Sequence, residues 1–218
     1  MDKVIIGIDQ SLSNTGLSII KRGEKPLFFS IFTDKLRGVI RLSFIVDNIL
    51  KIISENIDLN GDNKIIICRE DYSYGSKGDV FNLGELGGCI DLFIYRKMVE
   101  LNIENIEYYK IPPNSWKLLI LGSGAVKKDT HYLLLSFDKT GIRFDNDNIA
   151  DSYMIASAIK KMIDKEVNGE SIKFKFGMIS SKIRKKNKIT ERNISSINDD
   201  ELKKMIEETL EEYLIFKL

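Results

Sequence analysis

The chain has 218 residues, 30% of them charged, and a formal net charge of +1. This length predicts one domain with a sizeable core and leaves little room for a second full domain. The near-neutral charge gives no argument for a nucleic-acid partner, and no apolar run approaches the ~20 residues of a membrane-spanning helix. We therefore expect a cytoplasmic protein without a membrane anchor.

The first third of the chain predicts three strands in an antiparallel meander. Residues 4–8, 15–20 and 27–32 are rich in β-branched and aromatic side chains and are separated by turn-forming residues. Apolar residues at helical spacing then predict a helix over 36–53, followed by a strand over 64–68. A strand reached through a helix is usually parallel to its neighbour, so we expect this strand beside the first.

Further helices and one more strand complete the predicted core. A helical pattern over 83–98 leads to a strand over 106–111, which ends at two prolines. Helices are also predicted over 114–120, over 127–140 and over about 147–163. The sequence thus predicts an α/β fold with a mixed five-stranded sheet, three strands antiparallel and two parallel, flanked by helices.

The end of the chain has a different character. We divide the chain into a main domain, residues 1–168, and an extension, residues 169–218. The stretch 173–192 carries eight Lys or Arg against one acid, and a helix is predicted over 199–215. Composition leaves open whether the basic stretch contacts phosphates or is a solvated, flexible segment.

Acids from three separate parts of the chain are placed where they can meet. Asp9 follows the first strand and Glu70 the fourth, so both lie at one sheet edge if these strands are parallel neighbours. Asp147, Asn148 and Asp151 share a face of the last core helix. Taken alone, Asp9 could be a turn cap and Asp147 a helix cap. Together, these residues offer oxygen ligands without His or Cys, a set that suits Mg²⁺, with Mn²⁺ as a substitute. The same set fits phosphoryl chemistry.

Five segments in this order resemble the RuvC-type Holliday junction resolvases of the ribonuclease H-like superfamily, in a form like those of bacteriophages. The resemblance covers roughly residues 1–163. Its segments are Gly-Ile-Asp-Gln-Ser-Leu-Ser-Asn-Thr-Gly at 7–16, Cys-Arg-Glu-Asp at 68–71, the glycine-bearing 83–88, the lysine and Gly-Ser-Gly region 113–128, and Ala-Asp-Ser-Tyr-Met-Ile-Ala at 150–156. The resemblance implies an endodeoxyribonuclease that resolves four-way junctions, and other branched DNA as a further option, by metal-dependent symmetric hydrolysis.

The resemblance also implies a catalytic mechanism with two metal ions. Asp9 would bridge the ions, and Glu70 and Asp151 would each complete one side. The family commonly has Asp or His where this chain has Asn148. Either Asn148, as an amide ligand, or the neighbouring Asp147 would therefore be the fourth ligand.

The same resemblance implies contacts to DNA. Where the family places an aromatic wedge after the glutamate, this chain has Ser73 flanked by Tyr72 and Tyr74. Either tyrosine can stack on a base or fill a structural role. The side chains implied to hold the phosphates are Lys117, Lys127 and Lys128.

A four-way junction is nearly two-fold symmetric, so cutting two opposed strands implies a homodimer with two sites. In the family, the glycine-bearing helix builds the dimer interface. Here this helix is predicted over 82–99, and Gly84, Gly87 and Gly88 would allow close approach of the partner. Core packing would explain the same glycines without a partner.

Two other functions are compatible with the sequence. An actin-like or sugar-kinase-like ATPase also begins with a strand, an aspartate, a small turn and a second strand. Such enzymes need a duplicated domain and another Gly-rich phosphate segment, for which this chain has little room. The third option is a non-catalytic protein that binds branched DNA, because Asn148 departs from the ligand pattern.

Overall fold

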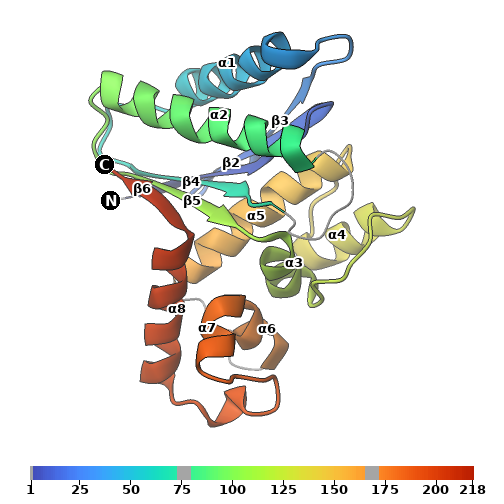
Figure 1. Cartoon of the computed structure of the whole chain (residues 1–218), viewed down its shortest axis with the longest axis vertical. Coiled ribbons are helices and arrows are strands. Elements are labelled where there is room, and N and C mark those ends of the chain that lie inside the picture. The colour runs from blue at the N-terminus through green and yellow to red at the C-terminus, as the bar shows by residue number, and fades with distance from the viewer. Residues whose placement is uncertain (1, 73–79, 165–171) are drawn as a thin grey trace.

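The computed structural model of the chain describes residues 2–72, 80–164 and 172–218. Within these residues, six strands form one sheet in the spatial order β3-β2-β1-β4-β5-β6 (Figure 1). The strands are β1 (Lys3–Asp9), β2 (Asn14–Lys21), β3 (Leu27–Phe32), β4 (Lys64–Glu70), β5 (Ile106–Ile111) and β6 (Leu214–Lys217). The helices are α1 (Gly38–Asn56), α2 (Val80–Glu100), α3 (Pro113–Leu121), α4 (Tyr132–Thr140), α5 (Asp147–Ile163), α6 (Ile172–Gly177), α7 (Ser181–Lys186) and α8 (Asp199–Tyr213), with a 3-10 turn, η1, at Ile194–Ser196.

The pairing of the first five strands confirms the predicted mixed α/β sheet. β1 pairs antiparallel with β2 and parallel with β4, β2 pairs antiparallel with β3, and β4 pairs parallel with β5. In the β1–β4 pair, Ile8 lies opposite Arg69. Asp9 and Glu70 are the next residues of these two strands. Both acids therefore lie at the same carboxyl-terminal edge of the sheet.

The sheet is covered by helices on both faces, which explains why its central strands are apolar almost throughout. α1 and α2 lie on one face, and α5 lies on the other with α3 and α4 nearby (Figure 1). Side chains of β1 alternate between these layers: Ile6 and Ile8 pack with α1 and α2, whereas Ile5 packs with α5. The core consequently consists of two apolar layers separated by the sheet.

Two glycines let α5 press directly onto the sheet. A Cβ added at Gly7 of β1 would lie 1.9 Å from the main-chain oxygen of Ser152. A Cβ at Gly16 of β2 would lie 2.2 Å from the main-chain oxygen of Asn148. Both distances are far below van der Waals contact, so these positions accept no larger side chain without a shift of α5. This close approach places the first turns of α5 over the end of β1.

The prediction of five strands is wrong in its count, because the end of the extension adds a sixth. The helix predicted over 199–215 ends at Tyr213, and Leu214–Lys217 pair antiparallel with β5. Phe216 stacks on Tyr108 of β5, with ring centroids 5.1 Å apart, and meets Tyr95 of α2 edge to face at 5.2 Å. The open edge of β5 offers unpaired backbone groups and an aromatic surface, and β6 satisfies both.

Helix boundaries also differ from the prediction before α4 and in the basic stretch. The helix predicted over 127–140 begins only at Tyr132, because the main-chain N–H of Tyr132 bonds to the Asp129 oxygen in a turn. The basic stretch forms two short helices, α6 and α7.

In the described parts of the chain, no helix has both the length and the apolar content that a membrane span requires.

Replacing Phe216 by Ala tests the contribution of β6 to stability. We expect Phe216→Ala to lower the free energy of unfolding by about 2–4 kcal/mol, because it removes the ring that packs on β5 and α2. Urea denaturation at a fixed protein concentration measures this change. Phe32→Ala is the matched control, since Phe32 at the end of β3 is 56% exposed. Equal losses in the two variants would show that β6 does not stabilise the sheet.

Candidate active site

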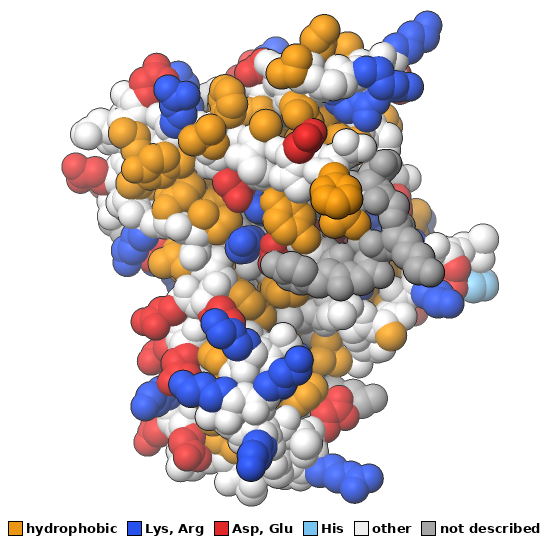
Figure 2. All heavy atoms as spheres, viewed as in Figure 1, with side chains coloured by type: hydrophobic (Ala, Val, Ile, Leu, Met, Phe, Trp, Pro, Cys, Tyr) orange, Lys and Arg blue, Asp and Glu red, His pale blue; other side chains and the backbone are white. Residues whose placement is uncertain are grey.

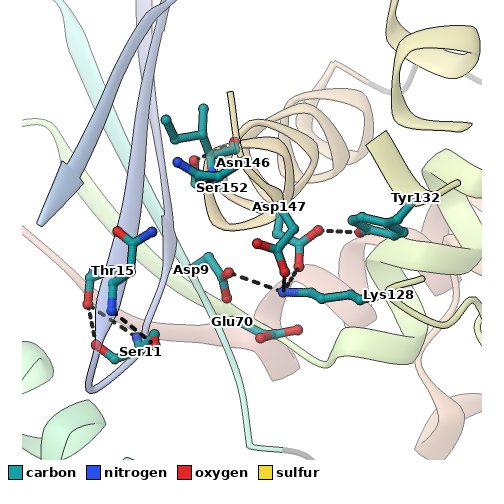
Figure 3. A network of polar contacts seen from close by, with 12 residues as sticks. Asp9, Ser11, Thr15, Glu70, Lys128, Tyr132, Asn146, Asp147 and Ser152 are labelled. Atoms are coloured by element: carbon teal, nitrogen blue, oxygen red, sulfur yellow. Dashed lines mark hydrogen bonds and ion pairs between the residues drawn. The ribbon is translucent and has the colours of Figure 1, made fainter. Parts of the chain in front are cut away.

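Asp9, Glu70 and Asp151 meet at the carboxyl edge of the sheet, around the ammonium group of Lys128 (Figure 3). Asp9 ends β1, Glu70 ends β4, and Asp151 lies in the second turn of α5. The Lys128 Nζ lies 2.7 Å from Asp151 Oδ2 and 3.7 Å from Asp9 Oδ2. Asp9 and Asp151 are 4% and 1% exposed, so their charges are almost fully removed from water. The sequence predicted this convergence of the three acids.

The start of α5 is fixed by a side-chain cap. The Asn146 side chain accepts a hydrogen bond from the Ile149 main-chain N–H at 3.0 Å and donates one to Ser30 Oγ at 3.2 Å. This cap ties the first turn of the helix to β3. Asp147 and Asp151 are four residues apart and therefore lie on one face, above the ends of the central strands. The cap thus determines which helix side chains reach the cluster.

Burial raises the pKa values of all three acids, and repulsion between carboxylates adds to this for Asp9 and Glu70. For Asp9, burial raises the pKa well above its usual range, and repulsion from Glu70 adds to it. For Glu70, burial and then repulsion from Asp151 raise the pKa, and for Asp151 burial does so. Such a cluster is stable in its ionised form only with cations nearby.

Lys128 supplies one such cation. Burial by itself lowers the pKa of the Lys128 ammonium, but attraction to Asp9 and Asp151 outweighs burial and holds this pKa above its ordinary value. The lysine side chain is 36% exposed and reaches the cluster from the loop before α4. Lys128 therefore remains charged and partly neutralises the carboxylates.

Two buried aromatic side chains orient the carboxylates. The Trp116 Nε1–H of α3 donates to Glu70 Oε1 at 3.1 Å, and the Tyr132 hydroxyl of α4 donates to Asp151 Oδ1. The second Asp151 oxygen faces Lys128. Hydrogen bonds that hold one carboxylate oxygen in this way fix the direction of the other. The sequence analysis did not identify either role, and no spacing or motif in the sequence singled out Tyr132.

The remaining candidate ligands and DNA contacts are distributed around this cluster. The Asp147 Oδ2 lies 3.3 Å from Lys128 Nζ, whereas Asn148 is half-buried with its main-chain oxygen against Gly16. Lys117 lies over the ring of Trp116, with its Nζ 5.3 Å from the ring centroid. Lys127 is exposed in the loop before α4.

Tyr72 is half-buried and contacts neighbouring parts of the protein. Its hydroxyl donates to the Gly84 main-chain oxygen at 3.2 Å, and its ring faces the Arg69 guanidinium at 5.2 Å. These contacts give Tyr72 a structural role, and its side chain also lines the cavity described below, so base stacking stays a prediction. Ser73 and Tyr74, the other predicted wedge residues, lie outside the described residues.

A cavity of about 350 Å³ opens in front of the cluster. One of its lining residues, Gln10, is 8% exposed, and its Oε1 has no hydrogen-bond partner among the described residues. Acids and lysines line the same cavity, so a group bound there would contact both negative and positive side chains. The polar lining residues include Gln10, Glu70, Asp71, Lys117, Lys128 and Asp151.

The donor set fits a hard divalent cation. In the arrangement described, no three His, Cys, Asp or Glu of the described residues are placed to hold a metal ion, and Asp9, Asp147 and Asp151 bind the Lys128 ammonium. The ammonium is thus a stand-in cation among carboxylate oxygens, which are the donors that Mg²⁺ and Mn²⁺ prefer.

Comparisons with known proteins agree with this architecture. No family model and no curated protein matches the chain. Among solved structures, it is similar to Thermus thermophilus RuvC, with a TM-score of 0.52 and 16% identity over 75% of this chain and 97% of that chain. This likeness shows that the chain has the RuvC-type, ribonuclease H-like fold.

Two further solved structures match with lower scores. T. thermophilus RuvC in complex with Holliday junction substrate has a TM-score of 0.48 and 17% identity over 71% of this chain and 90% of that chain. The yeast mitochondrial Holliday junction resolvase Ydc2 has a TM-score of 0.41 and 16% identity over 71% of this chain and 78% of that chain. The bacteriophage-like form stays a prediction.

Replacing Tyr132 by Phe tests whether this hydroxyl holds the Asp151 carboxylate. The hydrogen bond stabilises the ionised acid, so its loss should raise the Asp151 pKa further and lower the free energy of unfolding by about 1–3 kcal/mol. Carbon-13 NMR titration of the carboxyl group measures the pKa. Tyr153→Phe is the control, because Tyr153 packs through its ring against Phe28 and Phe144. An unchanged Asp151 titration in Tyr132→Phe would contradict this role.

Proposed function

We propose that the protein is a metal-dependent, structure-specific endodeoxyribonuclease that resolves four-way DNA junctions by symmetric phosphodiester hydrolysis. The observation that carries this proposal is the convergence of Asp9, Glu70 and Asp151 at one edge of a RuvC-type sheet. The five sequence segments that resemble RuvC-type Holliday junction resolvases, together with the RuvC-like fold, support this choice of substrate.

In the proposed mechanism, Asp9, Glu70 and Asp151 hold two divalent cations, with Mg²⁺ as the physiological ion and Mn²⁺ as a substitute. When bound, such ions activate a water molecule and stabilise the leaving oxygen. Trp116 and Tyr132 keep the Glu70 and Asp151 carboxylates in a fixed orientation. These carboxylates therefore need little rearrangement when the site is filled.

The lysines have a second role in this proposal. Lys128, once released from the carboxylates, and Lys117 bind the phosphate that is cut, because both line the cavity in front of the cluster. We assign Lys127, which is exposed beside them, to a neighbouring phosphate of the same strand. As the fourth metal ligand we propose Asp147 in place of Asn148, because only Asp147 contacts the Lys128 ammonium.

We further propose a homodimer formed through the outer face of α2. Figure 2 shows hydrophobic side chains gathered on the part of the surface that α2 occupies in Figure 1. Among the described residues outside the adjoining part of α2, no atom lies within 4 Å of a Cβ added at Gly84 or Gly88, whereas Gly87 is buried and a Cβ there would lie 2.6 Å from the Tyr72 hydroxyl. Packing within the subunit thus accounts for Gly87. The exposed apolar residues on α2 are Phe81, Leu92, Phe93, Tyr95 and Val99.

Incubation with a synthetic four-way junction, with and without Mg²⁺, tests the proposed activity. We expect paired nicks at symmetric positions only when Mg²⁺ is present. Turnover of ATP without nicks would favour the kinase-like ATPase. Retention of the junction without nicks or turnover would favour a non-catalytic binding protein.

The proposed metal ligands are tested by Asp9→Asn and Glu70→Gln. Each variant should reduce single-turnover cleavage at least ~10²-fold, because Asp9→Asn removes a ligand shared by both ions and Glu70→Gln removes a ligand of one, and the proposed reaction needs both ions. Junction binding in the absence of metal should change less than about threefold, since neither acid holds the phosphates. The exposed Asp62→Asn is the matched control. Loss of junction binding in both active-site variants would argue against a metal role.

The pH dependence of cleavage follows from the raised pKa values of the three acids. Protons compete with metal ions for these carboxylates, so the cleavage rate should rise with pH as the acids lose their protons. A higher Mg²⁺ concentration should move the midpoint of this rise to lower pH. Single-turnover rates over a pH series at two Mg²⁺ concentrations measure this shift. A midpoint that does not depend on Mg²⁺ would contradict the proposal.

A further inference from the structure

The extension contains a strongly basic segment that the active site does not use. Residues 181–192 carry six Lys or Arg against the single acid Glu191, a net charge of +5 in a chain whose total is +1. The segment comprises α7 and the turn that follows it. Its charge is therefore concentrated on one small part of the molecule.

One of these basic side chains has a structural role. The Arg184 guanidinium lies 4.2 Å over the Phe176 ring and donates hydrogen bonds to the main-chain oxygens of Phe176 and Ile179. On the same helix, Ile183 is buried, and Ile189 is buried just beyond it. Arg184 and the two isoleucines fasten α7 to the protein and leave its other side exposed.

The lysines of the segment lie on the exposed side. Lys185 and Lys186 are exposed on α7, and Lys188 and Arg192 are exposed after it. None of these four side chains forms an ion pair with a residue that the structure describes. Lys182, by contrast, has its Nζ 3.5 Å from Glu212 Oε1. Lys185, Lys186, Lys188 and Arg192 therefore present unneutralised charge, and we call them the basic face.

The basic face is rigidly connected to the active-site edge of the sheet. Ser180, the cap residue of α7, receives a hydrogen bond from the Ile183 main-chain N–H at 3.2 Å, and its own main-chain N–H donates to Thr209 of α8 at 3.0 Å. The Tyr213 hydroxyl at the end of α8 donates to Ser115 of α3 at 3.1 Å. α7 thus has a fixed position relative to α3.

α3 in turn belongs to the active site, because Lys117 and Trp116 lie on it. A Cβ at Gly177 of α6 would lie 3.0 Å from the Leu119 main-chain nitrogen, so α6 packs tightly on α3. A second cavity, of about 250 Å³, is lined both by Asp71, which follows Glu70, and by Ser180 and Ser181. The start of α7 and the residue after β4 therefore line one cavity, and Figure 1 shows α6 and α7 below α3.

We propose that the basic face binds the phosphates of a duplex DNA arm that extends beyond the active-site cavity. Lysines bind phosphates as point charges without reading sequence, which suits a backbone contact. The aromatic side chains of this region, Phe174 and Phe176, are half-buried, so they are not presented for stacking on unpaired bases. The choice of branched DNA rests on the proposed function, whereas the phosphate contact itself does not require cleavage.

The test compares neutralised lysines in two places on the full-length protein. The first variant combines Lys185→Gln, Lys186→Gln and Lys188→Gln, and the matched control combines Lys25→Gln, Lys51→Gln and Lys203→Gln, which are exposed lysines elsewhere. Binding is measured without divalent metal over a KCl series, using junctions with arms of about 25 base pairs and of about 8 base pairs. Thermal melting of each variant verifies that it is folded.

We expect the first variant to bind the long-armed junction about tenfold more weakly at ~0.1 M salt, with a salt slope smaller by about 3, because each lost phosphate contact removes about 0.9 from that slope. Affinity for the short-armed junction should be unchanged. The charge-preserving variant Lys185→Arg, Lys186→Arg, Lys188→Arg should bind as the wild type does. Equal weakening in the first variant and the control, or in long and short arms, would overturn the inference.

Failure of this inference is distinguishable from failure of the proposed function. If wild-type protein cuts junctions and the first variant binds long arms normally, only the basic face is refuted. If wild-type protein cuts no junction but the first variant still loses affinity for long duplex arms, the basic face stands as a DNA-binding surface and the nuclease proposal fails.

Discussion

The arrangement of charges at the end of β1 is the constraint on which the rest of the site depends. Asp9 and Asp151 are almost fully buried, and burial raises the pKa values of both and of Glu70, while repulsion adds to this for Asp9 and Glu70. The ionised cluster therefore needs a cation beside it. Lys128 provides that cation here. Its ammonium group and a divalent ion would compete for the same oxygens. In the proposed function, divalent ions take the place of this ammonium group.

The same edge of the sheet is mechanically linked to α2, the helix proposed to form the dimer. Arg69, which precedes Glu70, is fully buried and makes two hydrogen bonds to the Asp91 carboxylate of α2, at 2.6 and 2.7 Å. Tyr108 of β5 donates to the same carboxylate at 2.8 Å. Breaking such a buried pair costs about 3–5 kcal/mol, so α2 and the end of β4 move as one unit. Contacts on α2 are thereby linked to the position of Glu70.

Much of the fold could be predicted because the residue patterns within each segment favour the same strand or helix that the folded protein contains. The runs 4–8, 64–68 and 106–111 are short and β-branched or aromatic, and each is bounded by turns or prolines, which favours buried strands. β6 was missed because Leu214 and its neighbours continue the apolar spacing of α8. Residues 214–217 form a strand because they pair with the free edge of β5, where Phe216 stacks on Tyr108.

Residue types and their spacing establish which chemistry is available: strands that end in acids, a helix that carries Asp147 and Asp151 on one face, and lysines between them. These features depend on residue type and on periodicity, which are local. Three features appear only in the folded molecule: Lys128 lies among the acids, Trp116 and Tyr132 hold two of them, and the extension adds a strand to the sheet. Those contacts join residues far apart in the chain, and packing over the whole molecule selects them.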